Sequence, residues 1–229
     1  MKVLSVNAGQ ARAVPYTDAP GGTTGIDKHP VDGPVRVAPP GPPGLAGSGV
    51  AGDAVCDRRF HGGDDRAVYA FAREDLDTWQ RDLERPLANG SFGENLTTAG
   101  IDLDNALVGE RWQIGQEAVL EVTGGRIPCR TFAEWLGEKG WVRRFTRAAS
   151  CGAMLRVIVP GDIRAGDPIT VVRLPVHEVT VSRLFRAVTT QRETLPDMLV
   201  AAPWMEREQR EIAERYQDLI TARGSQDRL

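Results

Sequence analysis

The sequence contains few cysteines and has no long apolar run. Its three cysteines, Cys56, Cys129 and Cys151, are an odd number without C-x-x-C spacing, which argues against a disulfide framework and a structural zinc site. No stretch approaches the roughly 20 apolar residues of a transmembrane helix. The N-terminal residues lack the apolar segment of a signal peptide. We therefore expect a cytoplasmic protein, in a reducing compartment and without a membrane anchor.

The sequence also lacks a surplus of basic residues. Lys and Arg number 28 against 31 Asp and Glu, which gives a formal net charge of -3. This balance disfavours binding to a nucleic-acid polymer. At 229 residues, 41% of them hydrophobic, the chain can build one large domain with a small appendage.

Residues 1–174 consist mainly of short, valine-rich runs separated by glycine and proline turns. These runs predict strands over residues 3–7, 35–37, 67–71, 118–123, 154–159 and 169–172. Apolar residues at helical spacing predict helices over 74–83 and within 131–147. The pattern is typical of a mainly β barrel or sandwich with inserted helices.

Residues 175–229 are predicted to form a small subdomain of three helices. Apolar residues recur at i, i+3, i+4 and i+7 from Val181 to Val188, and Thr180 is a suitable N-cap. A short helix is expected around 197–201 and a longer one from 205 to 220. Since residues 177–229 hold eight arginines against nine acidic residues, we interpret this subdomain as a packing or dimerising unit and not as a DNA-binding module.

Residues 38–49 contain four prolines and four glycines, a composition that predicts a mobile loop. The overlapping segment Gly47 to Gly52 matches G-x-G-x-x-G. A dinucleotide-binding fingerprint, however, requires a strand before the motif and a helix after it. A proline-rich loop precedes it here and residues 53–60 do not resemble a helix, so a Rossmann fold is not expected.

Cys129 is the residue most suggestive of chemistry. It lies between Arg126 and Arg130, shortly after a predicted strand and just before a predicted helix. The thiolate is the reactive and metal-ligating form of cysteine, and both cations and helix N-termini favour it. Taken alone, Cys129 could equally be a small buried hydrophobic residue.

Two further segments combine glycines with polar side chains. In His61-Gly62-Gly63 the glycines allow the backbone to approach a ligand closely, and the nearby Arg66 could hold a phosphate through two hydrogen bonds. The alternative is a tight turn with a satisfied histidine. In Gly93-Glu94-Asn95 the alternative is a β-turn in which Asn95 bonds its own backbone.

Together, the order and spacing of these segments resemble the MOSC-domain family, which is named after the C-terminal domain of molybdenum cofactor sulfurase. The similarity is to the stand-alone, YiiM-like branch and covers nearly the whole chain. The matching segments are Thr24-Gly25-Ile26, Pro34-Val35-Arg36-Val37, Gly52-Asp53, His61-Gly62-Gly63-x-Asp65-Arg66, Gly93-Glu94-Asn95, Arg126-x-Pro128-Cys129, Arg156-Val157 and Gly166-Asp167.

This resemblance implies a MOSC-type β-barrel over 1–174, a helical extension over 175–229, and a bound molybdenum cofactor (molybdopterin). It implies that Cys129 ligates molybdenum and that His61 is a second catalytic residue, a proton donor. The implied cofactor-binding residues are Arg126, Cys129, His61, Gly62, Gly63, Asp65, Arg66 and Asn95.

Several positions depart from the family pattern. Arg66 stands where relatives usually carry lysine, and Gly124-Gly125 stands before Arg126 where a proline is common. Residues 38–49 resemble an insertion, and whether they cover the site is left open. We interpret Cys56 and Cys151 as packing residues.

The resemblance favours an enzyme that reduces N-hydroxylated small molecules, such as hydroxylaminopurine bases, to amines. A separate reductase would supply electrons, because the chain has no flavin, haem or iron–sulfur motif. One alternative is a sulfur carrier that uses a Cys129 persulfide in cofactor sulfuration. Another is a non-catalytic module that binds the cofactor or another anion. A homodimer formed partly through the helical extension is a further hypothesis, and the sequence leaves the oligomeric state open.

Overall fold

The structure, a computed structural model, describes residues 1–226. Its strands are β1 (Lys2–Gly9), β2 (Arg12–Ala13), β3 (Thr23–Thr24), β4 (Lys28–Pro30), β5 (Val35–Val37), β6 (Val68–Ala72), β7 (Leu96–Ala99), β8 (Arg111–Ile114), β9 (Ala118–Gly124), β10 (Ala153–Val159), β11 (Gly161–Ile163) and β12 (Ile169–Arg173). Its α-helices are α1 (Arg73–Asp82), α2 (Arg130–Leu136), α3 (Trp141–Ala148), α4 (Val181–Thr189), α5 (Leu195–Met198) and α6 (Arg207–Gln226). Short 3₁₀ turns lie at η1 (Asp64–Arg66), η2 (Arg192–Thr194) and η3 (Leu199–Ala201).

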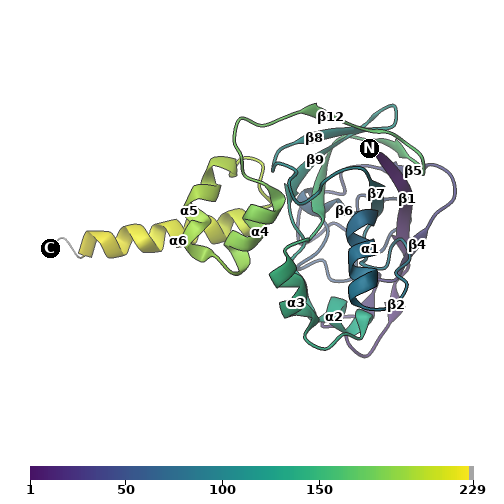
Figure 1. Cartoon of the computed structure of the whole chain (residues 1–229), viewed down its shortest axis with the longest axis horizontal. Coiled ribbons are helices and arrows are strands. Elements are labelled where there is room, and N and C mark those ends of the chain that lie inside the picture. Colours follow the sequence, from purple (N-terminus) through teal and green to yellow (C-terminus); the bar gives the residue numbers. More distant parts are fainter. Residues whose placement is uncertain (227–229) are drawn as a thin grey trace.

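Eight strands form one curled sheet in the order β12-β8-β9-β10-β6-β7-β1-β4. Neighbouring strands are antiparallel except β6 and β7, which are parallel. The sheet curls until β1 meets the start of β12, where Lys2 bridges Pro168 and the Val3 N–H donates to the Asp167 carbonyl at 2.9 Å. This closure produces the barrel seen in Figure 1 and confirms the predicted mainly β fold.

The predicted strands are all present, with ends shifted by one or two residues at most. They were recognisable because their valine-rich runs are buried: in β10, Ala153, Leu155 and Val157 alternate inward. β8 was missed because it is only four residues long, so its alternation of half-buried Arg111 and Gln113 with buried Trp112 and Ile114 is too short to stand out. β4 and β11 are three residues long and give little sequence signal.

An aromatic cluster attaches the first three helices to the barrel. Trp79 of α1, Phe132 of α2, and Trp141 and Phe145 of α3 are at most 4% exposed and pack around Phe92. The Trp79 and Trp141 ring centroids are 4.7 Å apart, and those of Phe132 and Trp141 are 5.4 Å apart. This packing fixes the orientation of α2, the helix that follows Cys129.

The C-terminal helices lie beside the barrel, and α6 points away from it (Figure 1). The Thr180 side chain accepts the Arg183 N–H at 3.1 Å, which confirms the predicted N-cap of α4. α4 contributes Phe185 to the barrel core and Leu184 to a second apolar cluster with α5 and α6. Because α4 belongs to both cores, the boundary between residues 174 and 175 stays a prediction. Residues 227–229, the end of the predicted extension, lie outside the described residues.

Residues 38–49 contain neither helix nor strand, and they pack against the segment that follows His61. The Gly63 N–H donates to the Gly47 carbonyl at 3.0 Å, and the Asp64 N–H donates to the Gly41 carbonyl at 2.8 Å. No helix begins within residues 53–60, so the G-x-G-x-x-G segment lacks the following helix that a dinucleotide-binding motif requires. Within residues 1–226, no helix combines the length and apolar character that crossing a membrane requires.

Candidate active site

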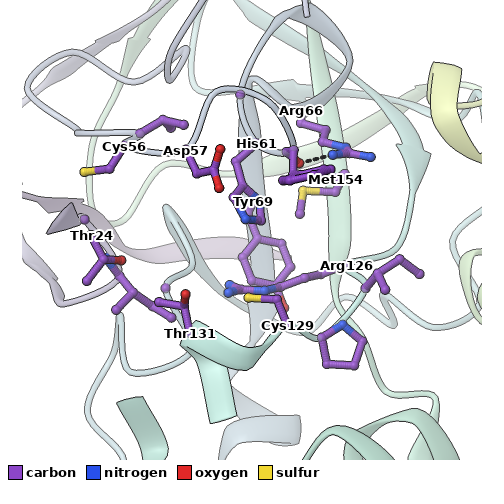
Figure 2. A pocket seen from close by; sticks show the side chains of 18 of the residues that line it. Thr24, Cys56, Asp57, His61, Arg66, Tyr69, Arg126, Cys129, Thr131 and Met154 are labelled. Atoms are coloured by element: carbon purple, nitrogen blue, oxygen red, sulfur yellow. Dashed lines mark hydrogen bonds between the residues drawn. The ribbon is translucent and has the colours of Figure 1, made fainter. Parts of the chain in front are cut away.

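A cavity of about 430 Å³ opens where the barrel, α2 and the C-terminal helices meet (Figure 2). Six of the predicted site residues line it: His61, Gly62, Arg66, Asn95, Arg126 and Cys129. Gly63 and Asp65 do not line it. Segments separated by more than 60 residues in sequence therefore meet around one space, as the motif pattern implied. Only Ser48 of residues 38–49 reaches this wall, so that segment supports the His61 turn and does not cover the cavity.

Cys129 is the N-cap residue of α2, and its side chain lies on the cavity wall. Its backbone is extended, and its carbonyl accepts the Ala133 N–H at 3.1 Å, which begins the helix. The residue is half-buried, unlike Cys151, which is fully buried. The structure thus confirms that Cys129 sits at a helix N-terminus, and it excludes a fully buried packing role.

Arg126 places a flat, fixed cation on the same wall. Its guanidinium carbon lies 4.4 Å from the Phe132 ring centroid and 5.1 Å from that of Tyr69. Nη1 donates to the Phe92 carbonyl at 2.5 Å. Gly93 leaves room for this arrangement, because a Cβ there would lie 3.1 Å from Nη1. Aromatic faces and one backbone acceptor orient the group without neutralising it.

The other cations on the cavity wall are all paired with carboxylates. Lys28 pairs with Asp53, Arg130 with Asp18, and Arg66 with two glutamates of the C-terminal region. Within the described part of the chain, Arg126 forms no ion pair. The uncompensated positive charge of this cavity is therefore concentrated at Arg126, which suits a ligand with an anionic group.

His61 faces the cavity as a neutral imidazole at neutral pH. Desolvation by the surrounding protein lowers the pKa of His61 to about 4, and the charges of Arg126 and Arg66 act in the same direction. The residue is nevertheless exposed to the cavity, and no described residue hydrogen-bonds its ring. The predicted turn is present, but the histidine in it is not satisfied by protein partners.

Arg66 and Asp65 connect the barrel to the start of α6. Arg66 Nη2 lies 2.9 Å from Glu206 Oε1 and 2.6 Å from Glu208 Oε2. Asp65 accepts the Arg207 N–H at 3.1 Å and also pairs with Arg156. Arg66 could bind an anion only by giving up its glutamate partners, so its predicted role in cofactor binding stays a prediction.

These contacts bring the C-terminal region onto the cavity wall, which sequence reasoning missed. Glu208, Gln209 and Ile212 line the cavity, together with Val188 and Thr189 of α4. No local pattern reports such contacts, because the Arg66–Glu208 hydrogen bond joins residues 142 positions apart.

Lys28 and Asp53 form a buried ion pair at the edge of the cavity, and sequence reasoning did not single out Lys28. Their side chains are 8% and 1% exposed. Asp53 also accepts the Gly9 N–H and Asn95 Nδ2, each at 2.9 Å. Burial lowers the pKa of Lys28 and Asp53 opposes this effect. Asn95 is therefore held by long-range partners, and the alternative of a turn bonded to its own backbone is wrong.

Gly124 and Gly125 permit close packing behind the site. A Cβ on Gly125 would lie 2.4 Å from Cys151 Sγ, and one on Gly124 would lie 2.7 Å from Gln209 Oε1. Cys151 is the buried packing residue that we expected. Cys56 differs from that expectation, because it is half-buried and lines the cavity.

The donor set fits an anionic ligand that carries its own metal. Within residues 1–226, no group of three or more His, Cys, Asp or Glu side chains is placed to hold a bare metal ion. The cavity offers two half-buried thiols, Cys129 and Cys56, and one uncompensated cation, Arg126. A molybdopterin cofactor matches this set, since its dithiolene supplies further sulfur ligands and its phosphate supplies the negative charge.

Comparisons with a family model, with curated proteins and with solved structures all point to the same family. Residues 57–170 match the MOSC domain. The chain is 34% identical over 164 residues to the uncharacterized protein YflK of Bacillus subtilis. This match covers 72% of this chain and 70% of YflK. It is 28% identical over 198 residues to a protein named Reductase from Gibberella moniliformis, covering 84% of this chain but 33% of that protein. The crystal structure of YiiM from Geobacillus stearothermophilus has the same fold, with a TM-score of 0.75 at 24% identity over 94% of this chain and 98% of that one.

Proposed function

Because the chain belongs to the MOSC domain family, we propose that it is a molybdenum-cofactor-dependent oxidoreductase that reduces N-hydroxylated compounds, such as hydroxylaminopurine bases, to amines. The observation that carries the proposal is the pairing of a half-buried thiol at Cys129 with the uncompensated cation of Arg126 in one cavity. The relative named Reductase supports an oxidoreductase. The match covers 33% of that relative, so the reductase activity is proposed for this chain and is not taken over from the relative's name.

The overall reaction consumes two electrons and two protons. An N-hydroxylated base, R–NHOH, gains them and yields the amine R–NH₂ and water. When bound, the cofactor supplies the redox chemistry at molybdenum. Cys129 would ligate the metal through its thiolate, and Arg126 would bind an anionic group of the cofactor through its guanidinium.

His61 would act on the departing hydroxyl. At neutral pH its ring is uncharged, because its pKa is about 4. It can therefore donate an N–H hydrogen bond from one nitrogen while the other accepts. A bound anionic ligand would offset the charges of Arg126 and Arg66, which raises the pKa of His61 and favours its use as a proton donor.

A sulfur carrier is the second candidate, favoured by the accessibility of the Cys129 thiol from the cavity. In that case the Cys129 sulfur would carry a persulfide on protein without metal. A module that only binds the cofactor is the third candidate, and it would hold pterin without turnover.

Metal and pterin analysis distinguishes these candidates. The protein is purified from a host with intact molybdopterin synthesis, beside Cys129→Ser and, as a matched control, Cys56→Ser, which changes another thiol on the same cavity wall. We expect about one molybdenum per chain in the wild type and in Cys56→Ser, and a loss of metal in Cys129→Ser. A persulfide on metal-free protein would support the carrier. Absence of both molybdenum and pterin from the wild type would contradict the proposal.

A further inference from the structure

A second concave surface lies outside the cavity, between α2, α3 and α4. This arginine groove has a volume of about 860 Å³ and is lined by Ala133, Gly140, Trp141, Val142, Arg143, Thr146, Arg147, Arg186, Thr190 and Gln191. Three of these residues are arginines, and none is an aspartate or glutamate. A strongly positive groove is unexpected from composition, because the chain has a formal net charge of -3.

The arginines of the groove have no protein partners. Arg143, Arg147 and Arg186 are exposed, and within residues 1–226 none of them forms an ion pair or a side-chain hydrogen bond. Arg144 on the same helix behaves differently, because it pairs with Asp82 at 3.6 Å and covers the Trp79 ring. The positive charge of the groove is therefore free to meet charge on another molecule.

The groove also offers apolar surface between its charges. Val142 is 41% exposed and Ala133 is half-buried, whereas the Trp141 side chain is 1% exposed and adds almost no accessible surface. Arginine is enriched at protein–protein interfaces, whose centres are more apolar than the rest of the protein surface. A free small anion would not use this apolar surface, whereas a protein partner would.

The groove and the cavity share a thin wall. Ala133 lines the groove, and its N–H donates to the carbonyl of Cys129, which lines the cavity, at 3.1 Å. The separation is one helical turn, about 5.4 Å along the axis. On α4, the consecutive residues Thr189 and Thr190 line the cavity and the groove respectively. A molecule seated in the groove would lie directly behind the residue proposed to hold the metal.

We propose that the arginine groove docks the electron donor of this enzyme, a small acidic protein that carries a flavin or an iron–sulfur cluster. This inference rests on the proposed function, which requires an external source of two electrons for each N-hydroxylated molecule. The reduced donor gives up those two electrons and is thereby oxidised. It delivers them together or in two successive encounters. The two protons come from water and end in the amine and the released water.

The charge of the groove defines how such a donor binds. Complementary charges accelerate encounter and fix orientation, and salt screens them over a Debye length of about 10 Å at 0.1 M. Binding and electron delivery should therefore weaken together as the salt concentration rises. Delivery from an uncharged or cationic small reductant should not follow this pattern.

The test measures binding and turnover separately. Isothermal titration calorimetry follows binding of two acidic probes, a flavodoxin and a plant-type ferredoxin, in 20 and 300 mM NaCl. The proteins are the wild type, Arg143→Glu/Arg147→Glu, Arg186→Glu, and Arg223→Glu as a control at an exposed arginine of α6 outside the groove. Turnover of an N-hydroxylated base by the holoenzyme is then measured with the binding carrier in reduced form and with reduced methyl viologen.

We expect at least one carrier to bind the wild type, with weaker affinity at high salt. The double variant should weaken binding by about tenfold or more, because two attractions become repulsions, and the control should bind as the wild type does. The donor-dependent kcat/KM should fall in parallel, while the rate with methyl viologen is kept.

Three results would overturn this assignment: binding of neither carrier to the wild type, unchanged binding in the double variant, or a wild-type dimer that dissociates in the double variant. The last would make the groove an interface between two copies of this chain. Absence of turnover with methyl viologen in the loaded wild type would contradict the proposed function instead, and the calorimetry would still decide whether the groove binds acidic carriers.

Discussion

Replacing Asp53 with alanine should destabilise the protein by about 3–5 kcal/mol, because the change leaves a buried ammonium without its counter-charge. The Lys28 side chain is 8% exposed, and Asp53 is its only ion-pair partner in the described residues. The same substitution removes the acceptor of the Gly9 N–H and one of the two acceptors of Asn95 Nδ2, which also donates to the Asn7 carbonyl at 3.3 Å. Since each unsatisfied buried donor costs about 1–3 kcal/mol, the upper part of the range is expected.

In a chain of 229 residues, this decrease in the free energy of unfolding should appear as a lower melting temperature. One kcal/mol shifts the Tm of a protein of this size by about 2–4 °C, so Asp53→Ala should melt roughly 6–20 °C below the wild type. Thermal and urea denaturation followed by circular dichroism measure the difference. Asp162→Ala is the matched control, because its ion pair with Arg36 is exposed, with side chains 58% and 52% accessible. It should change stability by less than about 1 kcal/mol.

The deficit should also depend on pH. Burial lowers the pKa of Lys28 from 10.5, and Asp53 counteracts this, so the pKa should fall further in Asp53→Ala. Between that lowered value and 10.5, the unfolded chain binds the Lys28 proton more tightly than the folded protein. The free energy of unfolding therefore rises with pH in this window, and the deficit should be smaller near pH 9.5 than near pH 7.

A double variant separates the buried charge from the lost hydrogen bonds. Lys28→Met/Asp53→Ala removes the uncompensated ammonium and should be more stable than Asp53→Ala alone. The reasoning would be refuted if Asp53→Ala cost less than about 1 kcal/mol, or if its deficit stayed constant between pH 7 and pH 9.5.

Three further predictions concern the cavity wall. Arg126→Gln should weaken the affinity for the pterin by about tenfold or more, and by more than Arg126→Lys, which keeps the charge. The pterin bound per chain is measured by its fluorescence after release. Equal binding by both variants would contradict this prediction. His61 should titrate with a pKa of about 4 in an NMR experiment. Between that value and about pH 6.5 the unfolded chain binds the His61 proton more tightly than the folded protein does, so the free energy of unfolding should fall as the pH falls. This fall should be smaller in His61→Asn, which has no imidazole to protonate. Gly125→Ala should cost about 1–3 kcal/mol in urea denaturation, because its Cβ would lie 2.4 Å from Cys151 Sγ, and Cys151→Ala in the same chain should recover part of the loss.

The strands of the barrel were predictable where burial imposes a composition. Runs such as Ala118 to Thr123 and Met154 to Val159 are valine-rich because the sheet buries them. The parallel pairing of β6 with β7 was not predictable, since no local pattern distinguishes it from the antiparallel pairs around it. The helices were found for a related reason. Apolar residues recur at helical spacing from Val181 to Val188 because α4 packs against two apolar clusters.

The candidate site was predictable in its centre and not at its borders. His61, Asn95, Arg126 and Cys129 stand in short motifs whose order could be recognised, and all of them line the cavity. Lys28 escaped notice because a single lysine in a three-residue strand carries no signal until Asp53 is placed beside it. The same reason applies to the C-terminal residues of the wall, whose contacts depend on folding over long sequence separations.

The contribution of α6 to the cavity wall constrains the order of events during synthesis. Chains are made from the N-terminus, and the barrel strands all precede residue 174. Glu208, Gln209 and Ile212 can complete the wall only after the chain has been synthesised beyond residue 212. A nascent barrel therefore has a cavity that is open on the side of α6, and the docking of α6 completes its wall. The cavity is consequently completed after the barrel strands have been synthesised, when α6 docks.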